Sequence, residues 1–203
     1  MAPGVLMIDV DGVVIRPRPG GWAAEIEADL GVSRALLGDS FFGPHWEDVV
    51  MGRAGLMERL APVLAQHAPH VTADALVAYW FEKDAELDHE LLADLARLRT
   101  EGWGLHLATV QEHLRAAHLW TTLGLSARFD AIHYSAAYGC GKPDAAFFHA
   151  VAARTGFAPG EMLLLDDKLD NVEGARAAGW LGALWTGAEP LSAVLAREGV
   201  RSG

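Results

Sequence analysis

The stretch VLMIDVDGVVI, residues 5–15, sets two aspartates one residue apart in an otherwise apolar run. Apolar residues without alternation predict a strand buried on both faces, as in a parallel sheet. Two like charges this close raise each other's pKa unless a cation or hydrogen-bond donors offset them. A turn at Asp11-Gly12 would account for those two residues and leave Asp9 without a role. A functional carboxylate pair accounts for both aspartates.

Composition limits the classes of function. The chain has 203 residues, 51% of them hydrophobic and 21% charged, as in globular domains. No apolar run is long enough for a membrane span and no basic segment opens the chain, so we expect neither membrane attachment nor a signal peptide. The single Cys140 excludes an internal disulfide and favours the cytoplasm. A net charge of −11 argues against nucleic acid as a partner, but a small anion could bind through a divalent cation.

The pattern after the first strand changes to helices. The segment RPRPGGW, residues 16–22, has the Pro and Gly density of a boundary. Apolar residues then recur at three- and four-residue spacing, which predicts helices and no strand up to about residue 84. The predicted helices are Ala23–Leu30, Glu47–Val50, Ala54–Ala65 and Ala73–Glu82. We therefore expect an inserted helical cap at residues 16–87 and a core formed by residues 1–15 and 88–203.

The second half of the chain alternates strands and helices. After a helix at Glu90–Thr100, the predicted strands are Gly104–Thr109, Phe129–Ser135, Met162–Asp167 and Leu181–Trp185. The predicted helices between and after them are Glu112–Leu123, a helix from Pro143, Asn171–Ala178 and a terminal helix within 190–203. This order predicts an α/β fold whose parallel sheet is covered by helices on both faces.

Polar residues end four of these strands, and ligands of open parallel sheets bind at that edge. Asp9 and Asp11 follow the first strand, Thr109 ends the second, and Asp166-Asp167 end the fourth. A cluster of three carboxylates is stable mainly around a hard cation. Oxygen ligands without His or Cys favour Mg²⁺ over zinc.

Lys142 follows the third strand in SAAYGCGKPD. Glycines at 139 and 141 let the backbone approach a ligand, and the ammonium would face the acidic corner. Pro143 stands where a nucleotide-binding P-loop needs Ser or Thr, so we reject that motif. Pro143 is predicted to be the first residue of the next helix, and Asp170 or Asn171 to cap the helix after it.

Four segments together resemble the motifs of the haloacid dehalogenase-like (HAD) hydrolase superfamily, in order. They are DVDGV from Asp9, LATVQEH around Thr109, CGKPD around Lys142, and LLLDDKLDNVEGARAAG from Leu163. The resemblance covers nearly the whole core and implies a HAD-like Rossmannoid sheet, with the helical cap inserted where that family carries one. The chain is most similar to small sugar-phosphate phosphatases of this superfamily, and also to the phosphatase domain of soluble epoxide hydrolases.

The resemblance implies roles for individual residues. Asp9 would be the nucleophile that forms an aspartyl phosphate, and Asp11 would protonate the leaving oxygen and then activate water. The implied substrate-binding residues in the core are Thr109, Val110 and Lys142. Mg²⁺ would be bound by Asp9, the backbone carbonyl of Asp11 and Asp167, with Asp166 and Asn171 in support.

Other interpretations stay open. Val110 replaces the Asn that the second motif often has, so a hydrogen bond near the nucleophile could be missing. A 2-haloacid dehalogenase also uses an Asp nucleophile, but it needs no metal and usually lacks an acid at the position of Asp11. A phosphomutase or a non-catalytic binding protein of the same fold are further alternatives. We expect a small phosphorylated substrate, contacts to it from His45 and Trp46, and a monomer or homodimer.

Overall fold

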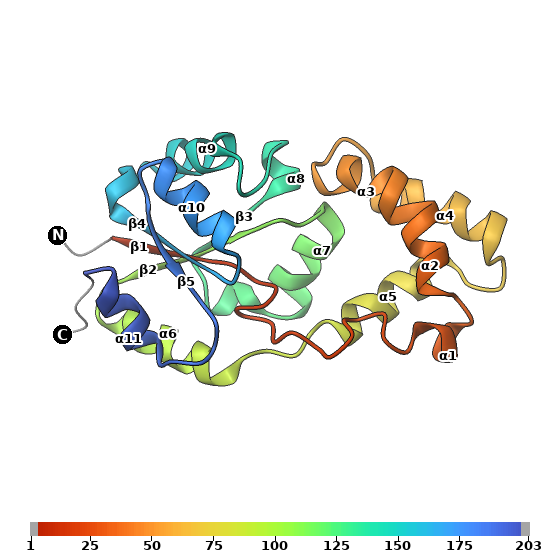
Figure 1. The fold of residues 1–203 in the computed structure, drawn as a ribbon, viewed down its shortest axis with the longest axis horizontal. Coiled ribbons are helices and arrows are strands. Elements are labelled where there is room, and N and C mark those ends of the chain that lie inside the picture. The colour runs from red at the N-terminus through yellow and green to blue at the C-terminus, as the bar shows by residue number, and fades with distance from the viewer. Residues whose placement is uncertain (1–3, 200–203) are drawn as a thin grey trace.

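A five-stranded parallel sheet forms the centre of the computed structural model, which describes residues 4–199. The strand order is β3-β2-β1-β4-β5, so the opening strand is central (Figure 1). The strands are β1 (Val5–Ile8), β2 (Gly104–Thr109), β3 (Ala131–Tyr134), β4 (Met162–Asp166) and β5 (Leu181–Leu184). The parallel sheet with helices on both faces confirms the predicted α/β class.

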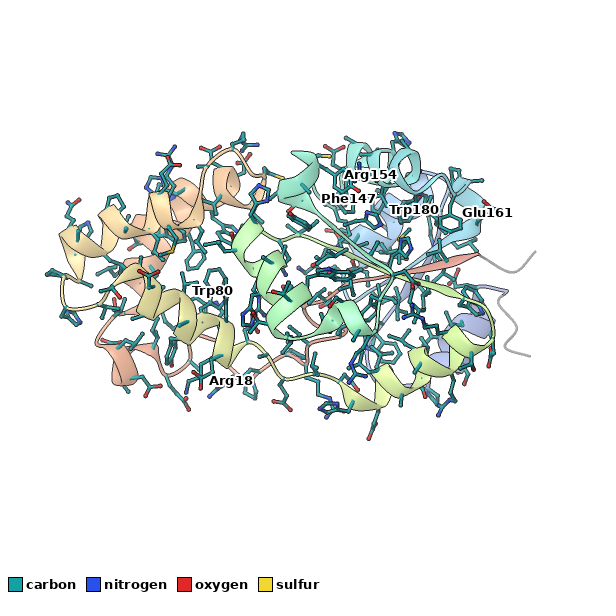
Figure 2. All side chains as sticks on the ribbon, turned by 180° about the vertical axis from the view of Figure 1, so that it is seen from behind. Arg18, Trp80, Phe147, Arg154, Glu161 and Trp180 are labelled. Atoms are coloured by element: carbon teal, nitrogen blue, oxygen red, sulfur yellow. The ribbon has the colours of Figure 1, made fainter. Side chains whose placement is uncertain are left out.

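Alternate residues of β1 supply two separate apolar layers, because successive side chains of a strand point to opposite faces. Leu6 and Ile8 pack with α6 (His89–Thr100) and α11 (Leu191–Arg197). Val5 and Met7 pack on the other face. That face is covered by α9 (Ala145–Thr155) and α10 (Leu169–Ala177), and Figure 2 shows Phe147 of α9 and Trp180 beside it. Burial on both faces explains why β1 has no polar alternation.

Short helical segments complete the core, and two predicted helix starts were wrong. These segments are α7 (His113–Ala117), η2 (His118–Thr122), η3 (Leu125–Ala127), α8 (Ser135–Tyr138) and η4 (Pro159–Glu161). Helix α9 begins at Ala145, because the Asp144 carboxylate caps it by accepting the Ala146 N–H at 2.9 Å. Pro143 therefore lies before the helix.

Helix α10 begins at Leu169, so neither Asp170 nor Asn171 caps it. The Asn171 side chain instead donates to Asp166 at the end of β4. The terminal helix α11 ends at Arg197, and residues 200–203 of its prediction lie outside the described part of the chain. Within residues 4–199, no helix has the length and apolar character needed to cross a membrane.

Residues 16–87, called the cap segment below, are helical throughout their regular structure. The helices are α1 (Ile26–Leu30), α2 (Arg34–Leu37), η1 (Gly38–Phe42), α3 (Gly43–Val50), α4 (Leu56–His67) and α5 (Ala73–Lys83). They enclose an apolar cluster of their own, which includes Trp80 of α5 (Figure 2). The cap segment lies beyond the carboxyl ends of the strands (Figure 1). Its expected boundaries remain a prediction.

The two connections between the cap segment and the core run side by side. Ile15 and Leu87 form an antiparallel bridge, the Arg16 N–H donates to the carbonyl of Glu86 at 2.8 Å, and the Asp88 N–H donates to that of Val14 at 2.9 Å. These bonds bring the entry and exit of the cap segment to one place beside the end of β1.

Candidate active site

Two carboxylates meet at the centre of the sheet edge. Asp9 directly follows β1 and Asp166 ends β4, and the pairing of Ile8 with Leu165 makes them neighbours. Asp9 is 5% exposed and Asp166 is fully buried. The ammonium of Lys142 lies 3.0 Å from Oδ1 of Asp9 and also contacts Oδ2 of Asp166. One buried cation therefore offsets two buried anions, as burial of charge requires.

Asp166 is saturated with donors. Its carboxylate accepts from the Asn171 amide at 2.9 and 3.1 Å and from the Lys168 N–H at 2.9 Å, in addition to Lys142. On Asp9, by contrast, Lys142 and the Val10 N–H (2.8 Å) both meet Oδ1. Among residues 4–199 no donor reaches Oδ2 of Asp9, which leaves that oxygen available for chemistry.

The third carboxylate, Asp167, fits a cation. One oxygen each of Asp9, Asp166 and Asp167 lie within 4.8 Å of one another. Oδ1 of Asp167 is buried and has no hydrogen-bond partner among the described residues. Gly12 has φ 85° and lies so near that a Cβ there would come 2.7 Å from Cγ of Asp167. Because a buried carboxylate oxygen needs a partner, these residues fit a hard cation such as Mg²⁺.

Burial and like charge act together on the acids of this cluster. Desolvation raises the pKa of Asp9 to about 6, against the attraction of Lys142 and with added repulsion from Asp166 and Asp11. Desolvation also raises the pKa of Asp167, and Asp9 and Asp166 add to that effect. A bound divalent cation would favour the ionised forms of both groups.

Asp11 has different surroundings. Oδ2 of Asp11 accepts a hydrogen bond from Nε2 of Gln111 at 2.6 Å, and the same nitrogen lies 3.4 Å from the Thr109 hydroxyl. Solvent reaches this side chain, yet the protein around the rest of the carboxyl still raises its pKa by desolvation. Asp84 adds repulsion, which Arg115 opposes. The raised pKa favours a protonated carboxyl, as a general acid requires.

Arg115 links this region to the cap segment. Its side chain is 1% exposed and its guanidinium lies 5.1 Å from the ring centre of Phe81. It donates to the carbonyl of Phe81 at 3.4 Å and to the carbonyl of Asp84, and its Nη2 lies 3.4 Å from the Asp84 carboxylate. Sequence reasoning missed Arg115, Gln111 and Ser135. Gln111 lies in the segment quoted for the second motif and Ser135 opens the segment SAAYGCGKPD, whereas Arg115 lies in neither.

The structure gathers the predicted core residues and places the predicted cap residues elsewhere. Asp9, Asp11, Thr109, Lys142, Asp166 and Asp167 meet at one edge of the sheet. Val110 and Lys142 line an adjoining hollow of about 480 Å³. Trp46 packs against Phe42 and Trp80 of the cap segment, with ring centres 5.4 and 5.6 Å apart. His45 lines a hollow of about 220 Å³ formed by cap residues alone, so substrate contact by His45 and Trp46 stays a prediction.

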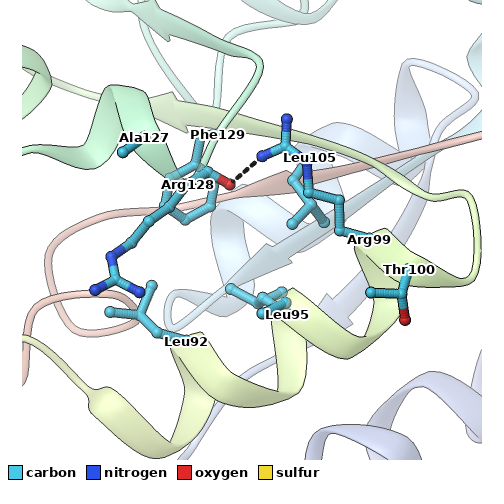
Figure 3. Close-up of a pocket in the computed structure, with 9 residues that line it drawn as sticks. Leu92, Leu95, Arg99, Thr100, Leu105, Ala127, Arg128 and Phe129 are labelled. Atoms are coloured by element: carbon cyan, nitrogen blue, oxygen red, sulfur yellow. Dashed lines mark hydrogen bonds between the residues drawn. The ribbon is translucent and has the colours of Figure 1, made fainter.

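A hollow of about 250 Å³ between α6 and the segment around η3 lacks this chemistry (Figure 3). Its lining is mainly apolar, and no carboxylate contributes to it. Nη1 of Arg99 donates to the carbonyl of Arg128 at 2.8 Å across it. Carboxylates and a buried cation meet instead at the sheet edge.

Solved structures share this architecture. A HAD family enzyme of Bacteroides thetaiotaomicron, in complex with magnesium and inorganic phosphate, superposes with a TM-score of 0.79 at 18% identity, over 95% of this chain and 98% of that one. A predicted HAD-like family hydrolase of Porphyromonas gingivalis gives 0.75 at 20% identity, over 97% and 98%. The L-2-haloacid dehalogenase of Xanthobacter autotrophicus gives 0.65 at 21% identity, over 97% and 82%. At these identities the likeness establishes the fold.

Sequence comparison gives the family. A search of curated proteins found no match. The family model described as haloacid dehalogenase-like hydrolase matches residues 4–179, from the opening strand through α10. That range contains both aspartates after β1, Lys142 and the acidic pair that ends β4. The chain belongs to the haloacid dehalogenase-like hydrolase family.

Proposed function

We propose that this hydrolase cleaves a small phosphate monoester, such as a sugar phosphate, in a Mg²⁺-dependent reaction through an aspartyl phosphate on Asp9. The observation that carries the proposal is the contrast between the two acids after β1. Asp9 lies 3.0 Å from Lys142 inside the carboxylate cluster, whereas Asp11 is held by Gln111 outside it. Two carboxyls in different surroundings can act as nucleophile and as acid at the same pH.

In the first step Oδ2 of Asp9 attacks phosphorus. Lys142 and the hydroxyl of Thr109 bind the phosphoryl oxygens, whose charge must be offset in the transition state. Asp11 donates its proton to the leaving oxygen as the bond from phosphorus to that oxygen breaks. The products of this step are an alcohol, the phosphorylated Asp9 and an ionised Asp11.

In the second step the ionised Asp11 accepts a proton from water as the water oxygen attacks phosphorus. The bond between phosphorus and Asp9 breaks, inorganic phosphate leaves, and both aspartates return to their starting forms. One carboxyl thus serves as acid and then as base, which requires a pKa that is neither fixed low by a cation nor extreme.

Asp9, Asp167 and the backbone carbonyl of Asp11 would hold Mg²⁺. When bound, the ion supplies positive charge that offsets the negative charge of the phosphoryl group. Asp166 supports the site indirectly, because Asn171 and the Lys168 N–H already fix its oxygens and it keeps Lys142 in place.

The test is phosphate release from a panel of phosphate monoesters, with Mg²⁺ or with a chelator. We expect turnover only with the metal, and a loss of at least about 10³-fold in Asp9→Asn, because an amide cannot replace the nucleophile. Asp74→Asn, an exposed acid on α5, is the matched control and should retain wild-type turnover. Undiminished turnover in Asp9→Asn would overturn the mechanism.

The same assay separates the alternatives. The fold likeness to an L-2-haloacid dehalogenase favours halide release from 2-haloacids as a second candidate, and that activity would persist with chelator. The acid at Asp11 and the carboxylate cluster support the phosphatase instead. A phosphomutase would yield an isomeric phosphate ester, and a binding protein would yield no product. We further propose a cytoplasmic monomer or homodimer that binds a small phosphorylated molecule.

A further inference from the structure

Ser135 joins the cap segment to the residue that holds Asp11. Its side chain is fully buried at the start of α8. Its Oγ lies 2.7 Å from the carbonyl oxygen of Val50, at the end of α3 in the cap segment. The same Oγ accepts the N–H of Gln111 at 3.0 Å and lies 3.1 Å from the Gln111 carbonyl oxygen. One hydroxyl therefore contacts both the cap segment and the backbone of Gln111.

The hydroxyl has a single proton for two carbonyl acceptors. The 2.7 Å distance to Val50 is that of a good O–H···O bond, whereas the 3.1 Å distance to Gln111 is long for one. With the cap segment seated, the proton goes to Val50. If the cap segment moves away, Val50 is lost as an acceptor and the proton turns to the Gln111 carbonyl. Cap position thus changes the bonding of Gln111.

The backbone of the cap segment at Gly52 packs closely against the core at Ala136. Gly52 has φ 72°, and a Cβ there would come 3.1 Å from the carbonyl carbon of Ala136, so only glycine permits this approach. The N–H of Ala136 in turn donates to the carbonyl of Gln111 at 3.2 Å. Both core residues under the cap segment are therefore also partners of the Gln111 backbone.

At the other end of Gln111, the side-chain amide holds Asp11 at 2.6 Å. This bond occupies Oδ2, so the proton that Asp11 delivers must be on Oδ1. A carboxyl whose second oxygen is fixed can rotate little, and proton transfer depends steeply on such alignment.

We propose that Gln111 is a positioning residue for Asp11, and that Ser135 makes this positioning depend on the seating of the cap segment. The inference rests on the proposed function, in which Asp11 protonates the leaving group. It adds that the acid is aligned only when Val50 accepts the Ser135 hydroxyl. Substrate held under a seated cap segment then meets an aligned acid, and an open site has a poorly aligned one.

The experiment compares two substrates that differ in their need for an acid. p-Nitrophenyl phosphate has a leaving group that departs without protonation, whereas a simple alkyl phosphate needs a proton donor. We expect Gln111→Met, which keeps the side-chain length and removes the donor, to slow alcohol release from the alkyl ester in a single turnover by about 10- to 100-fold. Single-turnover release of p-nitrophenol should change by less than about threefold, because formation of the aspartyl phosphate from the aryl ester does not use the acid. The comparison uses this first step, since kcat also contains the later hydrolysis in which Asp11 acts as base. Gln66→Met in the cap segment is the matched control.

Ser135→Ala should give the same selective loss at smaller size, and Ser135→Cys, which keeps a weak donor, should restore part of it. In the double variant Ser135→Ala/Gln111→Met the alkyl-ester loss should equal that of Gln111→Met alone, because both changes act on one chain of contacts. Aryl-ester turnover also verifies that each variant is folded.

Each outcome has a separate meaning. Equal losses in the single-turnover release of both leaving groups in Gln111→Met would overturn the positioning role while leaving the phosphatase in place. Additive losses in the double variant would overturn the link through Ser135. If the wild type releases phosphate from neither ester and Asp9→Asn has no effect on any substrate, the proposed function itself fails.

Discussion

The sheet edge and the aromatic cluster of the cap segment are stabilised by different interactions: ion pairs at the edge and apolar packing in the cluster. At the edge, Asp9, Asp166 and Lys142 are buried charges that depend on one another. In the cap segment, Trp22 stacks on Trp80 with ring centres 4.8 Å apart, within an apolar cluster. Loss of a partner at the edge leaves an uncompensated charge, whereas loss of a ring leaves a cavity. The two regions should therefore respond differently to mutation, to metal and to pH.

The largest effect should come from Lys142→Met. Removing the buried ammonium leaves Asp9 and Asp166 without their cation, and breaking a buried pair costs about 3–5 kcal/mol. Urea unfolding in chelator should show this loss, and Mg²⁺ should restore part of it by supplying positive charge. Lys168→Met, an exposed lysine beside the site, should change the unfolding free energy by less than about 0.5 kcal/mol. Equal losses in both variants would show that the buried ammonium of Lys142 does not stabilise the sheet edge.

Trp80→Ala should also destabilise the protein strongly, by about 3 kcal/mol, through the cavity left in the cap cluster. Here the loss should be the same with and without Mg²⁺, because no carboxylate of the cluster contacts the ring. Titration of Mg²⁺ monitored by calorimetry should give an affinity close to that of the wild type. A metal-dependent loss would show that the two regions are energetically linked.

His133 supplies a third kind of buried group, held by hydrogen bonds without a counter-ion. Nε2 of His133 lies 3.1 Å from Nδ1 of His106, and Nδ1 of His133 lies 2.8 Å from the Tyr138 hydroxyl oxygen. Desolvation, with repulsion from His106 and Arg154, lowers the pKa of His133 from 6.5 to about 4. The unfolded chain therefore binds a proton that the folded chain does not between pH 6.5 and about 4.

His133 should therefore lower the free energy of unfolding as pH falls from 6.5 to about 4, by up to about 3 kcal/mol. The measurement is the difference in unfolding free energy between the wild type and His133→Phe at pH 7.5 and at pH 4.5. Taking the difference cancels the titrating groups that do not contact His133, Asp9 among them. A difference that does not change with pH would mean that His133 titrates alike in both states.

The smallest effect on stability, and the most selective, should come from Gly12→Ala. Its positive φ costs a side chain about 1–2 kcal/mol, and Gly156→Ala, with φ 77° and no atom within 4 Å of the new Cβ, should cost the same. Only Gly12→Ala pushes on Asp167, so only it should weaken Mg²⁺ binding, by about tenfold or more. Calorimetry on both variants tests the role of Asp167 apart from backbone strain.

Local sequence pattern is enough to predict the class of fold and the polar residues that meet at the sheet edge. A short apolar run that does not alternate is typical of a doubly buried strand, and polar residues at the carboxyl ends of neighbouring parallel strands lie at one edge of the sheet. Asp9, Thr109, Lys142 and the acidic pair that ends β4 could be predicted for that reason. The predicted strands match the structure within a few residues, because the apolar residues of a buried strand follow one another in the sequence.

Contacts between groups that are far apart in the sequence become visible in the folded chain. Gln111 reaches Asp11 over 100 positions, Ser135 reaches Val50 over 85, and Arg115 binds the carbonyl groups that end α5. No local pattern encodes such contacts, because each is one hydrogen bond between residues placed by packing elsewhere. Helix starts at Ala145 and Leu169 were missed for the same reason: the capping and strand-end bonds of Asp144 and Asn171 depend on where neighbouring segments lie.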